Sequence, residues 1–408
     1  MAVNLAAPDY EQILPVEGIR IATGCAGIKT NGDTDLVLIE MCEGSTVSAV
    51  YTQNTFCAAP VTVAKQHQKE ATPRYLLINS GNANAGTGQQ GLQTAIASCE
   101  AVSNQLHVDT NTVLPFSTGV IGEQLPLDKI QAAIPNLVST LAKQQWFEAA
   151  LGIMTTDTVA KAVSRQVELA GSVITVTGIA KGSGMIRPDM ATMLSYIATD
   201  AVVDQALLDK MLKQATARSF NRISVDGDTS TNDACVLMAT AKADNAVLTD
   251  FDTPEAQILY QAIAEISRHL AHAIVRDGEG ATKFVAVEVE QGRDHDECLK
   301  VAYTIAHSPL VKTALFASDP NWGRILAAVG RSGLEHFDLT QVAIYLDDVC
   351  IIQAGEPAED YTEDKGQQVM NQDEITIKVV LNRGPASDTV WTCDFSYDYV
   401  KINAEYRS

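Results

Sequence analysis

One threonine near the middle of the chain is placed where a hydroxyl could generate its own catalytic base. Thr192 directly follows the small residue Ala191, in the apolar stretch after a glycine-rich bend that begins at Lys181. A hydroxyl here can attack the carbonyl of Ala191, cut the backbone and leave a free α-amine on Thr192, the adjacent base that an alcohol nucleophile needs. The pattern therefore predicts cleavage between Ala191 and Thr192 and a threonine nucleophile. The structural alternative is that threonine is common in apolar strands such as 193–198.

Polar loops that contain glycine lie at the ends of several predicted strands, which is where α/β proteins tend to bind ligands. Thr118 and Gly119 offer a hydroxyl and an unhindered backbone N–H in one bend, the donors from which an oxyanion hole is made. Glu279 lies between two glycines in the loop 276–283, so its carboxylate could project into a cleft. Two further loops are 79–86, which needs several left-handed residues, and 154–158, where threonines surround a carboxylate. Each loop also fits an ordinary turn or helix cap.

The segment Asp226–Asp233 suggests a rival chemistry. Its Asp-x-Asp start is typical of phosphatases in which one carboxylate attacks phosphorus with the help of a metal. Ser230 at the fifth position departs from that pattern, and the segment lacks the glycine at position six of a calcium loop. His269 and His272 lie three residues apart without a carboxylate at the spacing of zinc proteases. We therefore expect no metal site and no cofactor.

Apolar stretches of strand length alternate with helical patterns, which indicates a mixed α/β protein with layered sheets flanked by helices. The predicted strands are 35–41, 74–79, 172–180, 234–239, 282–290, 341–346 and 375–380. The predicted helices are 89–106, 127–141, 204–219 and 253–273. Asp252 is the expected N-cap of the last helix, because a short polar side chain there can accept from the first turn.

The 408 residues exceed the size at which a single hydrophobic core keeps growing, so two domains are expected. A polar segment, Gly292–Glu297, lies between two strand-like segments and is typical of a boundary. We therefore predict a catalytic domain over 1–285, which contains the cleavage site, and a smaller C-terminal α/β domain over 286–408 that contributes its terminal residues to the site.

Composition and charge narrow the classes of partner. The net charge of −21 predicts a surface that repels nucleic acid and anionic lipid. The eight cysteines are scattered without a Cys-x-x-Cys pair, as expected of free thiols in a reducing compartment. The start of the chain lacks the pattern of a signal peptide, and no apolar run has the length of a membrane span. These features predict a soluble cytoplasmic protein without nucleic-acid or membrane partners.

The segment 180–194, Ala-Lys-Gly-Ser-Gly-Met-Ile-Arg-Pro-Asp-Met-Ala-Thr-Met-Leu, resembles the processing site of the ornithine acetyltransferase family, the glutamate N-acetyltransferases of arginine biosynthesis. The resemblance covers most of the chain. Further matching segments are 14–20, 54–61, 78–85, 117–122, 154–158, 219–222, 226–233, 277–283, 318–324 and 399–408.

This resemblance implies a self-cleaving enzyme of fragments 1–191 and 192–408, which stay together as a heterotetramer with two copies of each. Thr192 would take acetyl from N-acetylornithine, release ornithine and pass the acetyl group to glutamate in a ping-pong cycle. Thr118 and Gly119 would hold the oxyanion. The substrate contacts that the resemblance implies are Thr155, Lys181, Thr192, Glu279, Asn403 and Ser408.

Two departures from the family pattern and several alternatives stay open. Asp189 replaces the usual asparagine before the cleavage site and could alter processing, whereas Ser408 replaces a terminal threonine and keeps its hydroxyl. Some family members also accept acetyl-CoA as a co-substrate, and no residue here decides that point. The alternatives are a related N-terminal-threonine amidohydrolase or aminopeptidase, and an uncleaved module that binds amino acids.

Overall fold

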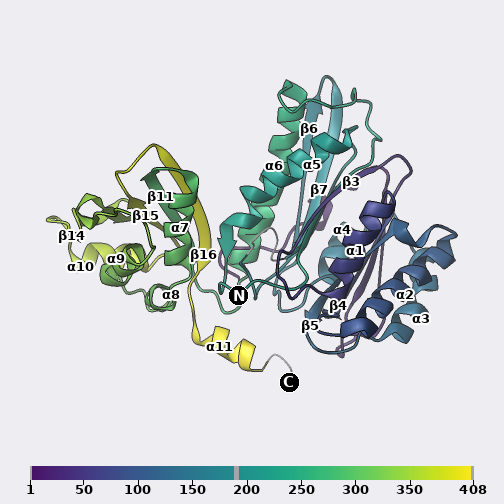
Figure 1. Ribbon diagram of the computed structural model, residues 1–408, viewed down its shortest axis with the longest axis horizontal. Coiled ribbons are helices and arrows are strands. Elements are labelled where there is room, and N and C mark those ends of the chain that lie inside the picture. The colour runs from purple at the N-terminus through teal and green to yellow at the C-terminus, as the bar shows by residue number, and fades with distance from the viewer. Residues whose placement is uncertain (1, 188–192, 406–408) are drawn as a thin grey trace.

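The computed structural model describes residues 2–187 and 193–405, which form three mixed sheets with helices on their faces (Figure 1). The α/β class predicted from the sequence is confirmed. Two sheets stack face to face and carry helices on their outer faces, while the third lies to one side with its own helices. Within the described ranges, no helix combines the length and apolarity needed to cross a membrane.

The first sheet has the strand order β1-β2-β4-β5. Its strands are β1 (Ile19–Gly24), β2 (Leu36–Met41), β4 (Tyr75–Asn82) and β5 (Val113–Val120). Helices α2 (Gly88–Leu106) and α3 (Leu127–Ser139) share a core with its outer face. In β2, Leu36 and Leu38 belong to that core, whereas Val37 and Ile39 belong to the core between the two sheets. The strand is apolar on both sides because both faces of the sheet are covered.

The second sheet has the order β3-β10-β8-β7-β6. Its strands are β3 (Thr46–Tyr51), β10 (Ala234–Ala239), β8 (Leu194–Thr199), β7 (Ser172–Lys181) and β6 (Lys161–Leu169). Helices α5 (Gln205–Ala217) and α6 (Pro254–Arg276) cover its outer face, and α1 (Ala59–Glu70) and α4 (Trp146–Gly152) contribute to the core between the sheets. The result is a stack of four layers, with helices outside and sheets inside.

The third sheet has the order β14-β13-β12-β15-β11-β16-β9. Its strands are β9 (Ile223–Ser224), β11 (Phe284–Gly292), β12 (Ala343–Leu346), β13 (Val349–Gln353), β14 (Glu356–Pro357), β15 (Glu374–Val380) and β16 (Ala386–Cys393). The helices beside it are α7 (His295–Ala306), α8 (Pro309–Phe316), α9 (Trp322–Gly330) and α10 (Glu363–Met370). The short strand β9 pairs with β16 and so links this sheet to the preceding part of the chain. The last helix, α11 (Tyr397–Ala404), extends away from the sheet (Figure 1).

Short 3-10 turns complete the described elements: η1 (Tyr10–Gln12), η2 (Thr110–Thr112), η3 (Phe220–Arg222) and η4 (Leu339–Gln341). Two sequence predictions are wrong in detail. Thr253 caps α6 in place of Asp252, since the Thr253 side chain accepts from Ala256 N. The polar segment after Gly292 leads into helix α7 and not into a second strand, because the Asp294 side chain accepts from Glu297 N and begins a helix there.

Candidate active site

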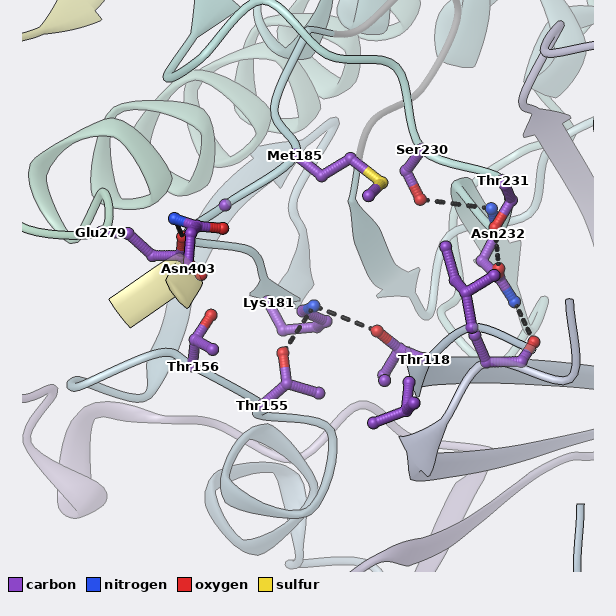
Figure 2. A pocket seen from close by; sticks show the side chains of 15 residues that line it. Thr118, Thr155, Thr156, Lys181, Met185, Ser230, Thr231, Asn232, Glu279 and Asn403 are labelled. Atoms are coloured by element: carbon purple, nitrogen blue, oxygen red, sulfur yellow. Dashed lines mark hydrogen bonds between the residues drawn. The ribbon is translucent and has the colours of Figure 1, made fainter. Parts of the chain in front are cut away.

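A cavity of about 260 Å³ lies where the ends of the first two sheets meet the C-terminal helix (Figure 2). Six residues singled out in the sequence line it together, although they come from five separate segments: Thr118 and Gly119 at the end of β5, Thr155 after α4, Lys181 at the end of β7, Glu279 after α6 and Asn403 in α11. Three other candidates, Ala191, Thr192 and Ser408, lie outside the described residues, as does Asp189.

Gly119 is required by the close approach of β4 and β5. Its φ angle is +132°, and a Cβ built there would lie 2.3 Å from the carbonyl carbon of Gly81. Asn79 holds the neighbouring loop, since its Oδ1 accepts from Ser117 Oγ at 2.6 Å and its Nδ2 donates to Asn82 O at 2.8 Å. The left-handed residues expected in the loop 79–86 are present at Gly81, Asn84 and Gly86. This loop therefore supports the bend that carries Thr118.

Lys181 forms hydrogen bonds with two hydroxyl groups of the cavity. Its Nζ donates to Thr118 Oγ1 at 3.1 Å and to Thr155 Oγ1 at 3.0 Å (Figure 2). Because an ammonium group only donates, each hydroxyl keeps its own proton for another acceptor. Burial lowers the pKa of Lys181, and the negative charges of Asp157, Asp233 and Glu279 act in the opposite direction. The arrangement can therefore present a hydroxyl donor and an ammonium donor to one ligand.

A buried ionic network supports Thr155 and Lys181 from behind. Lys161 Nζ donates to Asp157 Oδ1 and to Asp277 Oδ2, both at 2.7 Å, and its side chain is fully buried. Asp157 also accepts from the backbone N of Thr155 at 3.1 Å and of Gly182 at 2.7 Å.

The charges in this network set the protonation of Asp157. Burial alone would raise the pKa of Asp157, but the charges of Lys161 and Lys181 and the hydrogen bond from Gly182 hold it well below its usual range. Asp157 therefore stays ionised at neutral pH and fixes the backbone on both sides of the Thr155 and Lys181 side chains.

Asp277 also holds the chain segments behind the cavity in place. Its carboxylate accepts from the backbone N of Thr158 at 2.9 Å and from the Thr158 hydroxyl. Its carbonyl accepts from Ser183 Oγ at 2.5 Å, which ties the segment after β7 to the end of α6. The roles of Lys161 and Asp277 were not predicted from the sequence, although a lysine four residues after Asp157 is a signal for a local ion pair.

Glu279 and Asn403 form the opposite wall of the cavity. Glu279 Oε2 accepts from Asn403 Nδ2 at 2.8 Å, and the Glu279 backbone N donates to Ser183 O at 3.0 Å. Gly184 makes room for this carboxylate, because a Cβ there would lie 2.4 Å from the Glu279 carboxyl carbon. The C-terminal helix therefore reaches the cavity through the hydrogen bond from Asn403 to Glu279.

The later residues of the loop Asp226–Asp233 line the cavity, whereas its first residue accepts hydrogen bonds from the backbone of a neighbouring segment. The Asp226 carboxylate accepts from Met185 N at 2.6 Å and from Ile186 N at 2.9 Å, and it does not line the cavity. A carboxylate used in this way is a poor candidate for attack on phosphorus, which removes the main support for the phosphatase alternative. No group of three or more metal-ligating side chains occurs in the part of the chain that the structure describes.

Asn232 joins the two sheets at the cavity. Its Nδ2 donates to Ala83 O at 2.6 Å and to Ser117 O at 2.9 Å, so the second sheet holds the bend that precedes Thr118. The neighbouring residue Asp233 is buried and lines a smaller cavity with Thr118 and Lys181. From the sequence this loop was interpreted as a phosphatase or calcium motif and as a segment that matches the family, and its role in positioning the bend was missed.

The family profile named ArgJ family matches residues 20–408. The chain is 54% identical to the arginine biosynthesis bifunctional protein ArgJ of Psychrobacter arcticus over 409 residues, which is 100% of both chains. It is 56% identical to the protein of that name from Methylococcus capsulatus over 397 residues, or 97% of each chain.

Solved structures from two organisms are also similar in sequence. One is an arginine biosynthesis bifunctional protein from Bacillus halodurans, with 40% identity and a TM-score of 0.48, covering 51% of this chain and 96% of that chain. The other is the ornithine acetyltransferase of Mycobacterium tuberculosis in complex with ornithine, with 36% identity and a TM-score of 0.38, covering 43% of this chain and 94% of that chain.

Proposed function

The chain belongs to the ArgJ family, and on that premise we propose that it transfers the acetyl group of N-acetylornithine to glutamate. It is an acetyltransferase of arginine biosynthesis. The observation that carries the choice of substrates is one cavity with an ammonium group on one wall and a carboxylate on another. N-Acetylornithine carries both complementary charges, since it has an α-carboxylate and a side-chain ammonium group. We assign the carboxylate to Lys181 and the ammonium group to Glu279.

The reaction that we propose begins after the chain has cleaved at Ala191 and Thr192. The Thr192 hydroxyl attacks the acetyl carbonyl carbon, its proton passes to the Thr192 α-amine, and the developing oxyanion is held by the Thr118 hydroxyl and the Gly119 N–H. The bond to the ornithine nitrogen then breaks, and that nitrogen takes the proton. Ornithine leaves and an acetyl ester remains on Thr192.

The second half-reaction reverses these steps with another amine. The α-amine of glutamate attacks the ester carbonyl, the oxyanion again meets Thr118 and Gly119, and the Thr192 oxygen leaves and recovers its proton. The ammonium group of Lys181 faces a carboxylate in both halves, because ornithine and glutamate share the α-carboxylate. No metal or cofactor takes part in this proposal.

A mass measurement and a product assay test the proposal together. Under denaturing conditions we expect two fragments that meet between Ala191 and Thr192 in the wild type, and a single 43.7 kDa chain in Thr192→Ala. With N-acetylornithine and glutamate, the wild type should form acetylglutamate. Free acetate in place of acetylglutamate would favour the amidohydrolase alternative, and an uncut chain without an acyl-enzyme would favour a binding module.

The word bifunctional in the names of the relatives supports a second acetyl donor. We propose that this donor is acetyl-CoA, with glutamate as the acceptor and the same acetyl-Thr192 ester between them. Incubation with acetyl-CoA and glutamate, followed by chromatography for acetylglutamate, decides the point. Absence of product with acetyl-CoA, alongside normal turnover of N-acetylornithine, would restrict the enzyme to recycling.

A further inference from the structure

Glu279 lies on the link between helix α6, which covers the second sheet, and strand β11 of the third sheet. It is 6% exposed, and its carboxylate accepts from Asn403 in the candidate active site (Figure 2). Helix α6 ends at Arg276 and β11 begins at Phe284, so neither element fixes Glu279 directly. The contacts of the link 277–283 therefore decide where this carboxylate points.

The residues of the link before Glu279 are held by the second sheet. Asp277 pairs with the buried Lys161, which begins β6, and the Asp277 carbonyl accepts from Ser183 Oγ at 2.5 Å. The Glu279 backbone N donates to Ser183 O at 3.0 Å. These contacts fix the backbone as far as Glu279 against the segment that follows β7.

The last residues of the link are held by Asp394, which follows β16 and is 0% exposed. Asp394 Oδ1 accepts from the backbone N of Thr282 at 2.7 Å and of Lys283 at 2.9 Å. Its Oδ2 accepts from Thr282 Oγ1 at 2.7 Å. Hydrogen bonds to a carboxylate are stronger than those between neutral groups. Asp394 thus attaches the end of the link to the segment between β16 and α11.

The backbone directly after Glu279 is in close contact with the same segment. Ser396 Oγ donates to Gly280 O at 2.6 Å. Gly280 has φ +70°, and a Cβ built there would lie 2.5 Å from Tyr399 N. The chain is therefore held by the second sheet before Glu279 and by the C-terminal segment after it, and Glu279 lies where the two sets of contacts meet.

A buried lysine anchors the segment that contains Asp394. Lys312 in α8 is 1% exposed, and its Nζ donates to Thr392 Oγ1 at 2.9 Å and to Cys393 O. The same Nζ lies 4.6 Å from the centre of the Phe395 ring, in a cation–π contact. The residues on both sides of Asp394 are thus fixed to α8, so Asp394 offers the link a rigid attachment.

We infer that Asp394 is a positioning residue for Glu279 and thereby sets the preference of the enzyme for a substrate with a side-chain ammonium group. The inference rests on the proposed function, in which Glu279 receives that ammonium group and Lys181 receives the α-carboxylate. The two charges of the substrate must meet both partners at once, so the distance between Glu279 and Lys181 selects the substrate. A displacement of about 1 Å is enough to weaken such a match strongly.

Asp394→Asn tests the inference because it keeps the shape of the side chain and replaces one acceptor oxygen by an NH₂ group that only donates. The measurement is the ratio of kcat/KM for N-acetylornithine to kcat/KM for N-acetylnorvaline, which lacks only the ammonium group. We expect the ratio to fall by about 10-fold, because a hydrogen bond between charged groups contributes at least that factor. A loss of stability alone would lower both values equally and leave the ratio unchanged.

Asp35→Asn is the matched control. Asp35 is also 0% exposed, and it accepts from the backbone N of Ala26 at 2.6 Å, of Ile28 at 2.5 Å and of Lys29 at 3.0 Å. The loop that it holds contains none of the proposed substrate contacts. Asp35→Asn should therefore be destabilised as Asp394→Asn is, while its ratio of the two kcat/KM values stays that of the wild type.

A double-mutant cycle shows whether Asp394 acts through Glu279. In a Glu279→Gln background, Asp394→Asn should lower the ratio no further, because the charge that it positions is already absent. An equal additional fall in that background would overturn the inference. Thr282→Val provides a milder variant that does not depend on the folding of Asp394→Asn, since it removes only the hydroxyl that Asp394 accepts from. It should lower the ratio in the same direction, and a wild-type ratio in this variant would also overturn the inference.

The outcomes separate this inference from the function on which it rests. If Glu279→Gln keeps the wild-type ratio, the assignment of the ammonium group to Glu279 fails and the proposed function with it. If Glu279→Gln lowers the ratio but a folded Asp394→Asn does not, the proposed function stands and the role of Asp394 is wrong. A lowered ratio in both variants, with a normal ratio in Asp35→Asn, supports the inference.

Discussion

Lys181 shows how one side chain can set the chemistry of several others. Its ammonium group donates to the hydroxyls of Thr118 and Thr155 and still has a third N–H to offer. A neutral side chain of similar length could fill the space but could not orient these hydroxyls. At the scale of the residue, the site depends on donors whose directions are fixed before any ligand arrives.

Lys181→Met should lower kcat/KM for N-acetylornithine by about 10- to 100-fold, since a hydrogen bond to a charged group contributes about 1.5–3 kcal/mol. The loss should appear in both KM and kcat, because the ammonium group orients Thr118 as well as the substrate. Steady-state kinetics of the cleaved variant measure it. Lys143→Met is the control, because Lys143 pairs with Glu17 on the surface. Equal kinetics in the two variants would contradict the role of Lys181.

Gly119→Ala should destabilise the protein more than the same substitution at an unhindered glycine with positive φ. The added Cβ would collide with the backbone of Gly81, and the alanine would also have a strained φ. Gly44→Ala is a matched control, since Gly44 has φ +85° and no atom within 4 Å of an added Cβ. We expect about 1 kcal/mol for the control and a further 1–3 kcal/mol for Gly119→Ala. Denaturant unfolding measures both, and equal losses would contradict the steric argument.

At the scale of the element, strand and helix ends are held by ionic contacts that cross between them. Lys161 begins β6, Asp157 follows α4 and Asp277 follows α6, and the three meet in a buried network behind the cavity. Such a network is weak evidence for stability, but removal of one partner leaves uncompensated buried charge. Because the network joins the start of β6 to the segments that follow α4 and α6, it holds these three parts of the chain in one arrangement around the site.

Lys161→Met should destabilise the protein by about 3–5 kcal/mol, because two buried carboxylates lose their shared cation. Denaturant unfolding at pH 7 measures the change. Lys129→Met serves as a control, since Lys129 donates to Gly27 O at an exposed position. If Lys161→Met unfolds at the same denaturant concentration as the control, the network contributes no such stability.

The lowered pKa of Asp157 also predicts the direction of a pH effect. A carboxyl group whose pKa is lower in the folded state adds stability at neutral pH, and that stability is lost as the pH falls from about 4 toward the folded pKa. Asp157→Asn should therefore be less stable than the wild type at pH 7, and the difference should shrink in acid. Unfolding curves from pH 7 to pH 3 measure it. A constant difference would contradict the assignment.

The elements predicted from the sequence are those whose signals are local. β10 has the predicted bounds of 234–239, because turn residues flank a short apolar run, and α2 begins one residue before its predicted start. β6 and β16 were missed because their outward residues are polar and pairing with neighbouring strands holds them. The residues of the cavity could be named from motifs and resemblance. The contacts of Lys161 with Asp277 and of Asn232 with Ser117 could not, because they join residues more than 100 positions apart, whereas the pair of Lys161 with Asp157 is local and was overlooked.

At the scale of the whole molecule, the proposed fragments share one sheet. Strands β3, β6 and β7 belong to residues before Thr192, whereas β8 and β10 belong to residues after it. Lys181, Leu194, Ala234 and Tyr51 occupy one rung across four neighbouring strands. Separation of the fragments would break the β7–β8 and β3–β10 ladders and open two buried cores.

The fragments should therefore remain together after cleavage and co-purify through a tag on either one. We expect a heterotetramer with two copies of each fragment, which light scattering on the purified protein measures. A tag on residues 1–191 that recovers no second fragment under native conditions would contradict the shared sheet. An assembly mass equal to one copy of each fragment would contradict the tetramer.

The shared sheet also changes the number of chains that unfolding releases. The precursor unfolds to one chain, whereas the cleaved protein unfolds to separate chains whose reassembly depends on their concentration. The melting temperature of the wild type should therefore rise with protein concentration, and the dependence on concentration should be weaker in Thr192→Ala. Once this single peptide bond is cut, the stability of the folded state would depend on the concentration of the fragments. Dilution alone would then favour unfolding of the mature protein.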